Sequence, residues 1–452
     1  MSEIFRQVDR DTMFLLPPSI NDWLPEGHLA RFVVDIVNQL DLATIKSSYA
    51  GRGSKAHHPE MLVALLFYGY ATGVFSSRKL EQATYDSVAF RYIAANDHPD
   101  HDTIASFRRR FLPQLSPLFV QILQIAHQMG CLKLGKVSLD GTKIKANASK
   151  HRAMSYKHAC KLEKQLKEEV AELLRQAETA DHSEIPDGLD IPAELARREE
   201  RLDAIAVAKA EIEHRAEQRH TKEQAEYEQK VAARKAKEQK TGRKSRGKQP
   251  KPPEAGPRDK DQVNFTDEES RIMPISGGGF DQCYNAQASV DTETMLIVGQ
   301  HLSQHPNDKQ ELSPALDTLS TLPQNLGSID TILADTGYFS EANVDNCVEK
   351  NITPLISVKR DTHNQKLQDR FTEPEPPPDG ADNVTQMKYH LKTQAGRALY
   401  AKRKSTVEPV FGIIKSVMGF RQFLLRGVES VRGEWNLVCI GWNLKRLHAL
   451  AT

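Results

Sequence analysis

Three carboxylates in the sequence stand where metal-dependent chemistry can be built. Asp140 ends an alternating apolar run that begins at Val137, and Asp335 ends a second apolar run that begins at Ile332. Glu408 stands at the head of an apolar helical run. A single Asp at the end of such a run is most often a turn residue. Three carboxylates at element ends, however, can converge on a divalent cation, because such ions prefer hard oxygen ligands.

The elements around these residues set the expected geometry. The run 137–139 predicts a half-buried strand, and Asp140 with Gly141 predicts a turn at which the chain reverses. A helix is predicted over 393–418, where Pro409 should kink it or make it restart. The sequence therefore places two carboxylates at strand ends and one on a helix.

Length and composition indicate a water-soluble protein of several domains. A chain of 452 residues has room for two or three domains. Its apolar fraction of 39% and charged fraction of 27% are typical of soluble proteins. The 61 Lys and Arg nearly cancel the 60 Asp and Glu, so only local charge can identify a nucleic-acid partner.

Cysteine usage and hydropathy indicate the cytoplasm. Five cysteines are odd in number and lack CxxC spacing, which argues against a disulfide framework and a zinc site. No apolar run approaches the roughly 18 residues that cross a membrane. The N-terminal residues lack the basic-then-apolar layout of a signal peptide. We therefore expect a cytoplasmic protein with no membrane partner.

The first 130 residues are predicted to be helical. The last of the expected helices bears Arg108, Arg109 and Arg110 and follows two short helices. This order is typical of a helix-turn-helix-like unit whose last helix contacts DNA phosphates or a groove. An ordinary helical domain with solvated arginines fits the pattern equally well. The helical spacings lie at 29–40, 61–70, 76–83, 89–95 and 102–111.

Residues 151–276 interrupt the pattern with a charged segment. Two apolar stripes, one near 162–174 and one near 195–212, predict a helical hairpin. Residues 230–251 then hold ten Lys or Arg against one acid, Glu238. Such a block is usually solvated and disordered. The alternative is a sequence-independent grip on DNA phosphates.

From residue 277 the sequence alternates between strands and helices. Gly277–Gly279 is followed by neither a lysine nor a GxGxxG spacing, so a phosphate-cradling loop is not expected. Counting 137–139 first, three consecutive antiparallel strands precede an alternation of helices and strands. The expected strands are 284–290, 295–300, 331–334 and 353–358, and the expected helices are 308–319, 341–349, 393–418 and 429–448.

That order is the ribonuclease-H-like arrangement, and the three carboxylates fall at its active-site positions. The chain resembles the DDE transposases of bacterial insertion sequences, those with a helical N-terminal region. The blocks that carry this resemblance are 58–111, Val137–Lys143, Ala334–Tyr338, Val407–Gly412 and Lys415–Gly427.

The resemblance implies an α/β catalytic domain with a ribonuclease-H-like mixed sheet flanked by helices. This domain would comprise residues 131–150 and 277–452. Residues 1–130 would form an all-α, DNA-binding N-terminal domain, and residues 151–276 a charged helical-hairpin insertion with a basic linker.

The resemblance also implies an activity and its ligands. Asp140, Asp335 and Glu408 would hold two Mg²⁺ ions, for which Mn²⁺ can substitute, about 4 Å apart. The enzyme would bind the terminal inverted repeats of the element, cut the DNA and transfer the strand ends to a target. Its partners would be double-stranded DNA and further copies of itself, as a homodimer or larger assembly in the bacterial nucleoid.

Basic residues on the last catalytic helix are implied to contact DNA. Lys415 follows Glu408 by two helical turns and so shares its face. Arg403 and Lys404 are further candidates, whereas Tyr400 lies one position early for the family pattern. The alternative for Lys415 is an ordinary surface lysine.

Two other functions remain open. One is a catalytically silent DNA-binding regulator of the same fold, which the intact set of carboxylates disfavours. The other is a related metal-dependent nuclease, which would not need the helical N-terminal region.

Overall fold

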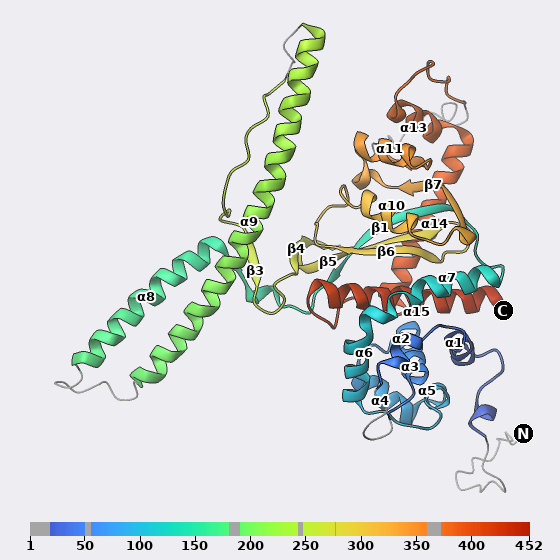
Figure 1. Cartoon of the computed structure of the whole chain (residues 1–452), viewed down its shortest axis with the longest axis horizontal. Coiled ribbons are helices and arrows are strands. Elements are labelled where there is room, and N and C mark those ends of the chain that lie inside the picture. The colour runs from blue at the N-terminus through green and yellow to red at the C-terminus, as the bar shows by residue number, and fades with distance from the viewer. Residues whose placement is uncertain (1–18, 50–55, 180–189, 243–246, 276, 359–371) are drawn as a thin grey trace, which may run out of the picture. The chain divides into compact units, whose positions relative to one another are not determined.

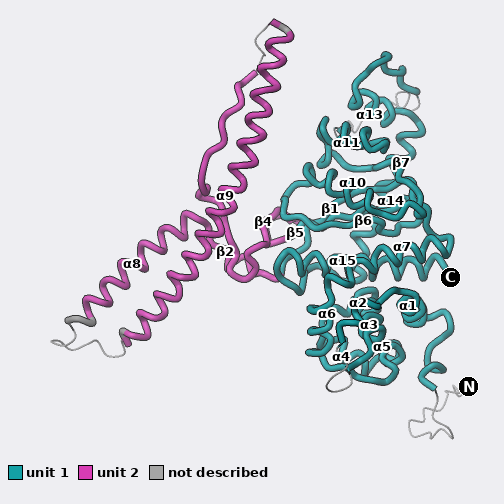
Figure 2. The backbone as a smooth tube through the Cα atoms, viewed as in Figure 1, with its two compact units in different colours: residues 1–146, 284–452 teal, residues 147–283 magenta. Residues whose placement is uncertain are grey.

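The computed structural model describes residues 19–49, 56–179, 190–242, 247–275, 277–358 and 372–452 (Figure 1). The chain divides into two compact units (Figure 2). The first comprises residues 1–146 and 284–452, and the second comprises residues 147–283. The N-terminal helices thus belong to the same compact unit as the sheet that follows them.

A mixed sheet forms the centre of the first unit. β5 and β6 form the predicted antiparallel hairpin, β5 lies beside β1, and β1–β7 and β7–β8 are parallel pairs. The register pairs Val137 with Ile332, and both side chains are fully buried. Parallel strands covered on both faces are expected to be apolar throughout. The strands are β1 (Leu134–Lys145), β5 (Phe280–Asp291), β6 (Ile297–Ser303), β7 (Gly327–Ala334) and β8 (Thr353–Ile356).

Helices from the C-terminal part of the chain pack on this sheet. α15 buries Trp435 and donates its indole N–H to the Gln287 carbonyl at 3.1 Å, and Trp442 donates to the Met295 carbonyl at 2.9 Å. The last predicted helix, with its tryptophans facing the core, is therefore confirmed. The helices are α10 (Leu312–Ser320), α11 (Glu341–Glu349), α13 (Asn383–Lys392), α14 (Gln394–Ser416) and α15 (Val428–Ala451).

The predicted N-terminal helices are present, and α1, α3 and α6 pack on α15, as does α7. α3 is buried along nearly its whole length, because its apolar residues are not confined to one face. Among the described residues no single helix is long and apolar enough to span a membrane; α3 and α4 reach that length only together, across a 95° bend. The helices are α1 (Leu29–Val37), α2 (Ala43–Ser47), α3 (Pro59–Thr72), α4 (Ser77–Asp86), α5 (Val88–Ile93), α6 (His101–Leu115) and α7 (Leu118–Gln128).

The second unit contains the predicted helical hairpin. α8 (Tyr156–Thr179) packs on the first part of α9 (Ile191–Thr241) through the two apolar stripes (Figure 1). The connection between the two helices, residues 180–189, lies outside the described residues. Three short strands complete the unit: β2 (Ala153–Ser155) pairs with β3 (Gln262–Asn264), and β4 (Arg271–Pro274) pairs with the start of β5.

Several expectations about individual elements are wrong. The chain does not reverse at Asp140, because β1 continues through Gly141 to Lys145. α14 runs through Pro409 as one helix, which rules out the restart that was one of the two predicted alternatives. Residues 230–241, expected to be disordered, continue α9 to its αL cap at Gly242. Six elements were not predicted from the sequence: α2, α7, α13, β2, β3 and β4.

Candidate active site

The three predicted carboxylates converge on one guanidinium group. Arg403, on α14, donates to Glu408 Oε1 at 2.8 Å and to Asp140 Oδ2 at 3.2 Å. The same guanidinium lies 3.6 Å from Asp335 Oδ2. Asp140, Asp335 and Glu408 come from β1, the end of β7 and α14, so three separate elements bring three negative charges around one positive charge.

The strand β1 carries Asp140 into this cluster without a turn. Gly141 is required for close packing: a Cβ added there would lie 2.1 Å from Gln287 Nε2 and 2.8 Å from Asp308 Oδ1. Any larger residue would therefore push Asp140 or its neighbours out of place. The glycine that predicted a turn instead marks a close approach between β1 and the side chains of β5.

Asp335 ends β7 and begins the short 3-10 helix Thr336–Tyr338. Its Oδ1 accepts the Gly337 amide at 2.8 Å, which leaves Oδ2 facing Arg403. Glu408 lies on α14 beside the buried Val407, and its side chain is half exposed. Two of the three carboxylates are therefore open to solvent, and Asp140 is the most enclosed, with 18% of its side chain exposed.

Burial dominates the electrostatics of Asp140. It raises the pKa of this carboxyl to about 6, against the lowering effects of Arg403 and of the Gly141 amide. Repulsion from Asp335 and Asp308 adds to the increase. Burial lowers the pKa of Arg403, but attraction to Asp140 and the neighbouring acids outweighs it, so that the pKa is raised overall. Arg403 is thus a permanent cation. Its positive charge favours the ionised form of Asp140, against the effect of burial.

The oxygen chemistry of the cluster fits a hard divalent ion. Carboxylates are the ligands that Mg²⁺ uses most, and few are needed because the ion keeps several waters. Among the described residues no group of three or more His, Cys, Asp or Glu side chains is arranged to hold a metal as it stands. Each of the three carboxylates instead places one oxygen within 3.6 Å of the Arg403 guanidinium.

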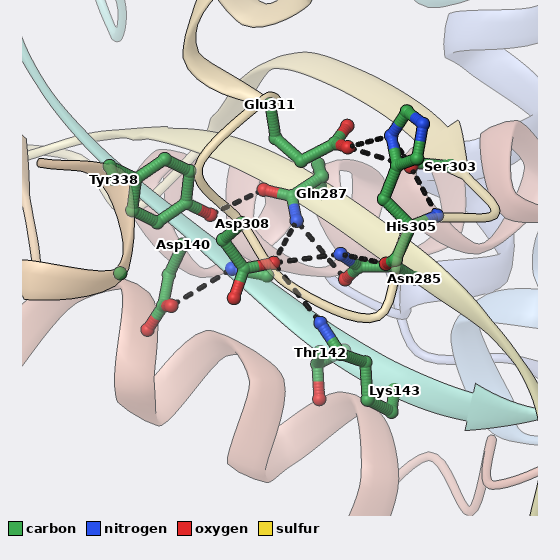
Figure 3. A network of polar contacts seen from close by, with 12 residues as sticks. Asp140, Thr142, Lys143, Asn285, Gln287, Ser303, His305, Asp308, Glu311 and Tyr338 are labelled. Atoms are coloured by element: carbon green, nitrogen blue, oxygen red, sulfur yellow. Dashed lines mark hydrogen bonds and ion pairs between the residues drawn. The ribbon is translucent and has the colours of Figure 1, made fainter. Parts of the chain in front are cut away.

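A fourth carboxylate, Asp308, lies beside the cluster (Figure 3). Its Oδ1 accepts hydrogen bonds from Asn285 at 2.7 Å, Gln287 at 2.8 Å and Lys143 at 3.1 Å. Gln287 in turn accepts from the hydroxyl of the buried Tyr338. Because Tyr338 follows Asp335 by three residues, this network ties the Asp335 turn to β1 and β5.

Another acid, Glu311, lies outside the cluster and anchors the loop that carries Asp308. It is 1% exposed and accepts from Ser303 at 2.7 Å. Glu311 also pairs with His305 at 2.7 Å and His301 at 3.0 Å. Burial raises its pKa, but these hydrogen bonds outweigh burial and lower it to about 2. The loop between β6 and α10 is therefore held by a charged, fully bonded carboxylate.

Sequence reasoning missed Asp308 because it assigned this residue to a helix over 308–319. In the structure α10 begins only at Leu312, which leaves Asp308 in the preceding loop. The signal was present in Pro306-Asn307-Asp308, three residue types that favour turns. A turn there sends the Asp side chain toward β1 rather than along a helix face.

The basic residues predicted on α14 have different surroundings. Arg403 was predicted to contact DNA, but it is buried among the carboxylates. Lys404 is exposed. Lys415 donates to the Thr142 hydroxyl and, at 3.2 Å, to the Lys143 carbonyl, so it lies next to the strand that carries Asp140. Tyr400 bonds the Ala334 carbonyl at 3.3 Å, one residue before Asp335.

The three arginines of α6 also differ from one another. Arg108 is buried and donates to the Phe75 carbonyl at 2.9 Å, which removes it from the candidate DNA contacts. Arg109 and Arg110 are exposed. Arg110 bonds the Ser48 carbonyl at 2.9 Å. The α6 surface therefore offers two arginines to a ligand rather than three.

Two family models match the chain. The model described as "Transposase DDE domain" matches residues 251–444, a range that includes Asp335 and Glu408 but not Asp140. The model described as "Transposase domain (DUF772)" matches residues 18–110. No curated protein and no solved structure matches the chain. The two matched regions together cover more than half of the sequence, and both descriptions name transposases. The chain therefore belongs to the DDE transposases of insertion-sequence type.

Proposed function

We propose that this transposase binds the terminal inverted repeats of its element and catalyses Mg²⁺-dependent strand cleavage and strand transfer. The observation that carries the proposal is the convergence of Asp140, Asp335 and Glu408 on Arg403 from three elements. Local structure alone gives no reason for acids from β1, the end of β7 and α14 to surround one guanidinium.

The strand arrangement supports a ribonuclease-H-like catalytic domain. β6, β5 and β1 lie side by side, and β7 and β8 continue the sheet parallel to β1. Asp140 on the central strand and Asp335 at the end of the next strand then occupy neighbouring positions. Helix α14 supplies the third acid across these strands.

The residues of the site have distinct roles in this proposal. Asp140, Asp335 and Glu408 would hold two divalent ions. When bound, such ions activate an oxygen nucleophile and offset the charge that develops on the phosphate. Arg403 balances the carboxylates in their absence. Lys415 and the exposed Lys404 would contact DNA phosphates on either side of Glu408, and Arg109 and Arg110 would contact DNA from the N-terminal helices.

One observation favours a silent DNA-binding protein as the second candidate. Arg403 neutralises the carboxylates, and a protein that never bound metal would keep such a pair permanently. The two candidates differ in whether divalent ions displace Arg403 from the acids.

Strand cleavage and joining on a duplex with the element's terminal repeats tests the proposal. We expect 3′-hydroxyl ends and joined products with Mg²⁺ and none with EDTA. Asp140→Ala, Asp335→Ala and Glu408→Ala should each reduce the rate at least about 100-fold, because several kcal/mol of charge stabilisation are lost at about 1.36 kcal/mol per tenfold.

The matched control is Asp330→Ala, which removes an exposed carboxylate from the same strand β7 and should cleave normally. Binding of the repeats without cleavage by the wild type would support the silent regulator. Cleavage that ignores the repeats would identify a nuclease instead.

A further inference from the structure

Three side chains donate hydrogen bonds to a single oxygen of Asp308 (Figure 3). Asn285 and Gln287 come from β5 and Lys143 comes from β1. Both amide side chains belong to fully buried residues. Burying an amide costs free energy unless its polar atoms are bonded, so two such residues in the middle of a sheet need a reason. The roles assigned to the carboxylates and to the basic residues of the site do not supply one.

The carboxylate of Asp308 lies close to both segments that carry the strand-end acids of the site. A Cβ built on Gly141, the residue after Asp140, would lie 2.8 Å from Oδ1 of Asp308. A Cβ built on Gly337, two residues after Asp335, would lie 3.8 Å from Oδ2. We propose that Asp308 is a positioning residue that fixes Asp140 and Asp335 relative to each other as ligands of divalent ions, an inference that rests on the proposed function.

The connection to the strand of Asp140 is direct. Lys143, three residues further along β1, pairs with Oδ1 of Asp308 at 3.1 Å, and both side chains are largely buried. Such a pair is screened by salt much less than a pair on the surface. The side-chain amide of Gln287 also approaches Gly141 so closely that a Cβ there would lie 2.1 Å from it. Asp308 and the β5 side chain that it holds therefore fix β1 immediately after Asp140.

The connection to Asp335 runs through two hydrogen bonds. Gln287 donates to Asp308 at 2.8 Å and accepts the hydroxyl of Tyr338 at its amide oxygen. Tyr338 is fully buried and ends the 3-10 helix that Asp335 begins. Its backbone amide donates to the Asp335 carbonyl at 3.2 Å. A change at Asp308 is therefore transmitted through Gln287 and Tyr338 to the turn that presents Asp335.

Two simpler roles for Asp308 make different predictions. A network that serves stability alone would lower the melting temperature when broken and leave the metal affinity of the folded protein unchanged. An acid that acts through its charge alone would weaken metal binding only when that charge is removed. Positioning predicts that a neutral change at the other end of the relay, Tyr338→Phe, weakens metal binding as well.

The experiment measures Mn²⁺ binding to the full chain from the loss of the electron paramagnetic resonance signal of the free ion. Asp308→Asn keeps the shape of the side chain and removes its charge, and Tyr338→Phe removes only the hydroxyl. The double variant is measured with them. The matched control is Asp317→Asn on α10, which breaks an exposed pair with Lys350 at 3.0 Å. Melting temperatures in EDTA establish that each variant is folded.

Groups that orient a metal ligand typically change metal affinity about 10- to 100-fold when they are lost. We expect each single variant to raise the Kd for Mn²⁺ about 10-fold or more, and the control to match the wild type. Because both changes break one relay, the Kd of the double variant should equal that of the more severe single variant. Independent effects would instead multiply.

Unchanged Mn²⁺ affinity in both single variants would overturn the proposal, and a lowered melting temperature beside it would assign the network to stability. Weaker binding by Asp308→Asn alone, or effects that multiply in the double variant, would reduce Asp308 to its charge. If Asp308→Asn does not fold, Tyr338→Phe decides by itself.

Cleavage of repeat-bearing DNA is measured alongside. A wild type that binds Mn²⁺ without cleaving refutes the proposed function, and the affinities of the variants still judge Asp308. A wild type that binds no Mn²⁺ refutes both.

Discussion

Arg403 is the residue that balances the charge of the carboxylate cluster. Its guanidinium is nearly enclosed, touches carboxylates from three elements, and has a buried Nε that bonds no described atom. A buried charge without a partner is costly, and so are three clustered acids without a cation. We therefore expect Arg403 and divalent metal to compete for the same carboxylate oxygens.

Replacement of Arg403 by Gln tests this competition. In EDTA the variant should melt at a lower temperature, because the acids repel one another without a counter-charge. Mn²⁺ should then raise its melting temperature more than that of the wild type. A tenfold tighter site adds about 1.4 kcal/mol of stabilisation at saturating metal. Differential scanning fluorimetry over a Mn²⁺ titration gives the comparison.

Lys402→Gln is the matched control for this experiment. It removes the same charge from the adjacent residue of α14, which pairs with Glu293 outside the cluster. Identical Mn²⁺ shifts in wild type, Arg403→Gln and Lys402→Gln would show that Arg403 does not compete with metal.

The sequence identified the acids of the candidate site more readily than their partners. Asp140, Asp335 and Glu408 stand out because each ends or begins an apolar run, a pattern visible without the fold. Arg403 and Asp308 do not stand out, because their roles depend on which distant residues surround them. The local sequence around an arginine does not indicate whether its side chain will be buried or exposed. The burial of Arg108 and Arg403 could therefore not be predicted.

At the scale of elements, the loop between β6 and α10 determines where Asp308 lies. The loop contains no helix or strand. Glu311 nevertheless ties it to β6 through hydrogen bonds with Ser303 and two histidines. Element types and order were predictable here from periodicity. The start of α10 could not be predicted, because residues 308–311 are of types that occur both in turns and in helices.

The lowered pKa of Glu311 predicts an acid-dependent stability. A carboxyl whose pKa falls on folding stabilises the folded state above its unfolded value of about 4.3. This stabilisation is lost as the pH falls toward the folded pKa of about 2. At 1.36 kcal/mol per unit, it amounts to roughly 3 kcal/mol at neutral pH.

Glu311→Gln should remove this contribution. Urea unfolding at pH 7, 5, 4 and 3.5 should show wild type and variant differing most at neutral pH and converging as the solution becomes acidic. A constant difference across this range would mean that the charge of Glu311 contributes nothing to stability.

At the scale of the molecule, the N-terminal helices and the sheet share one core. The fully buried Glu434 of α15 accepts the Leu424 and Leu425 amides at 2.9 and 3.0 Å and the Tyr70 hydroxyl at 3.2 Å. Arg108 of α6 lies beside it, since it donates to the same hydroxyl at 3.4 Å. The predicted domain of residues 1–130 is thus bonded to the C-terminal helix.

Glu434→Ala should therefore destabilise both regions together. It leaves two amides and the Tyr70 hydroxyl without their acceptor, and the buried Arg108 without its nearby counter-charge, at a cost of about 3–5 kcal/mol. Hydrogen exchange should accelerate in α3 and in β1 by similar factors. Glu429→Ala, at an exposed position of the same helix, should leave both unchanged. Faster exchange in α3 alone would mean that the N-terminal helices open as a separate domain.

β1 and its partner strand β7 are far apart in the sequence, which affects the order in which the protein can fold during synthesis. β1 leaves the ribosome roughly 190 residues before β7 does, which at ~5–20 residues per second is roughly 10–40 s. The contiguous unit 147–283 can fold during that interval, while β1 waits for its neighbour. The carboxylate cluster also needs α14, near the C-terminus, so it assembles only when synthesis is almost finished. A nascent chain therefore has no complete carboxylate cluster, which the proposed cleavage of DNA requires.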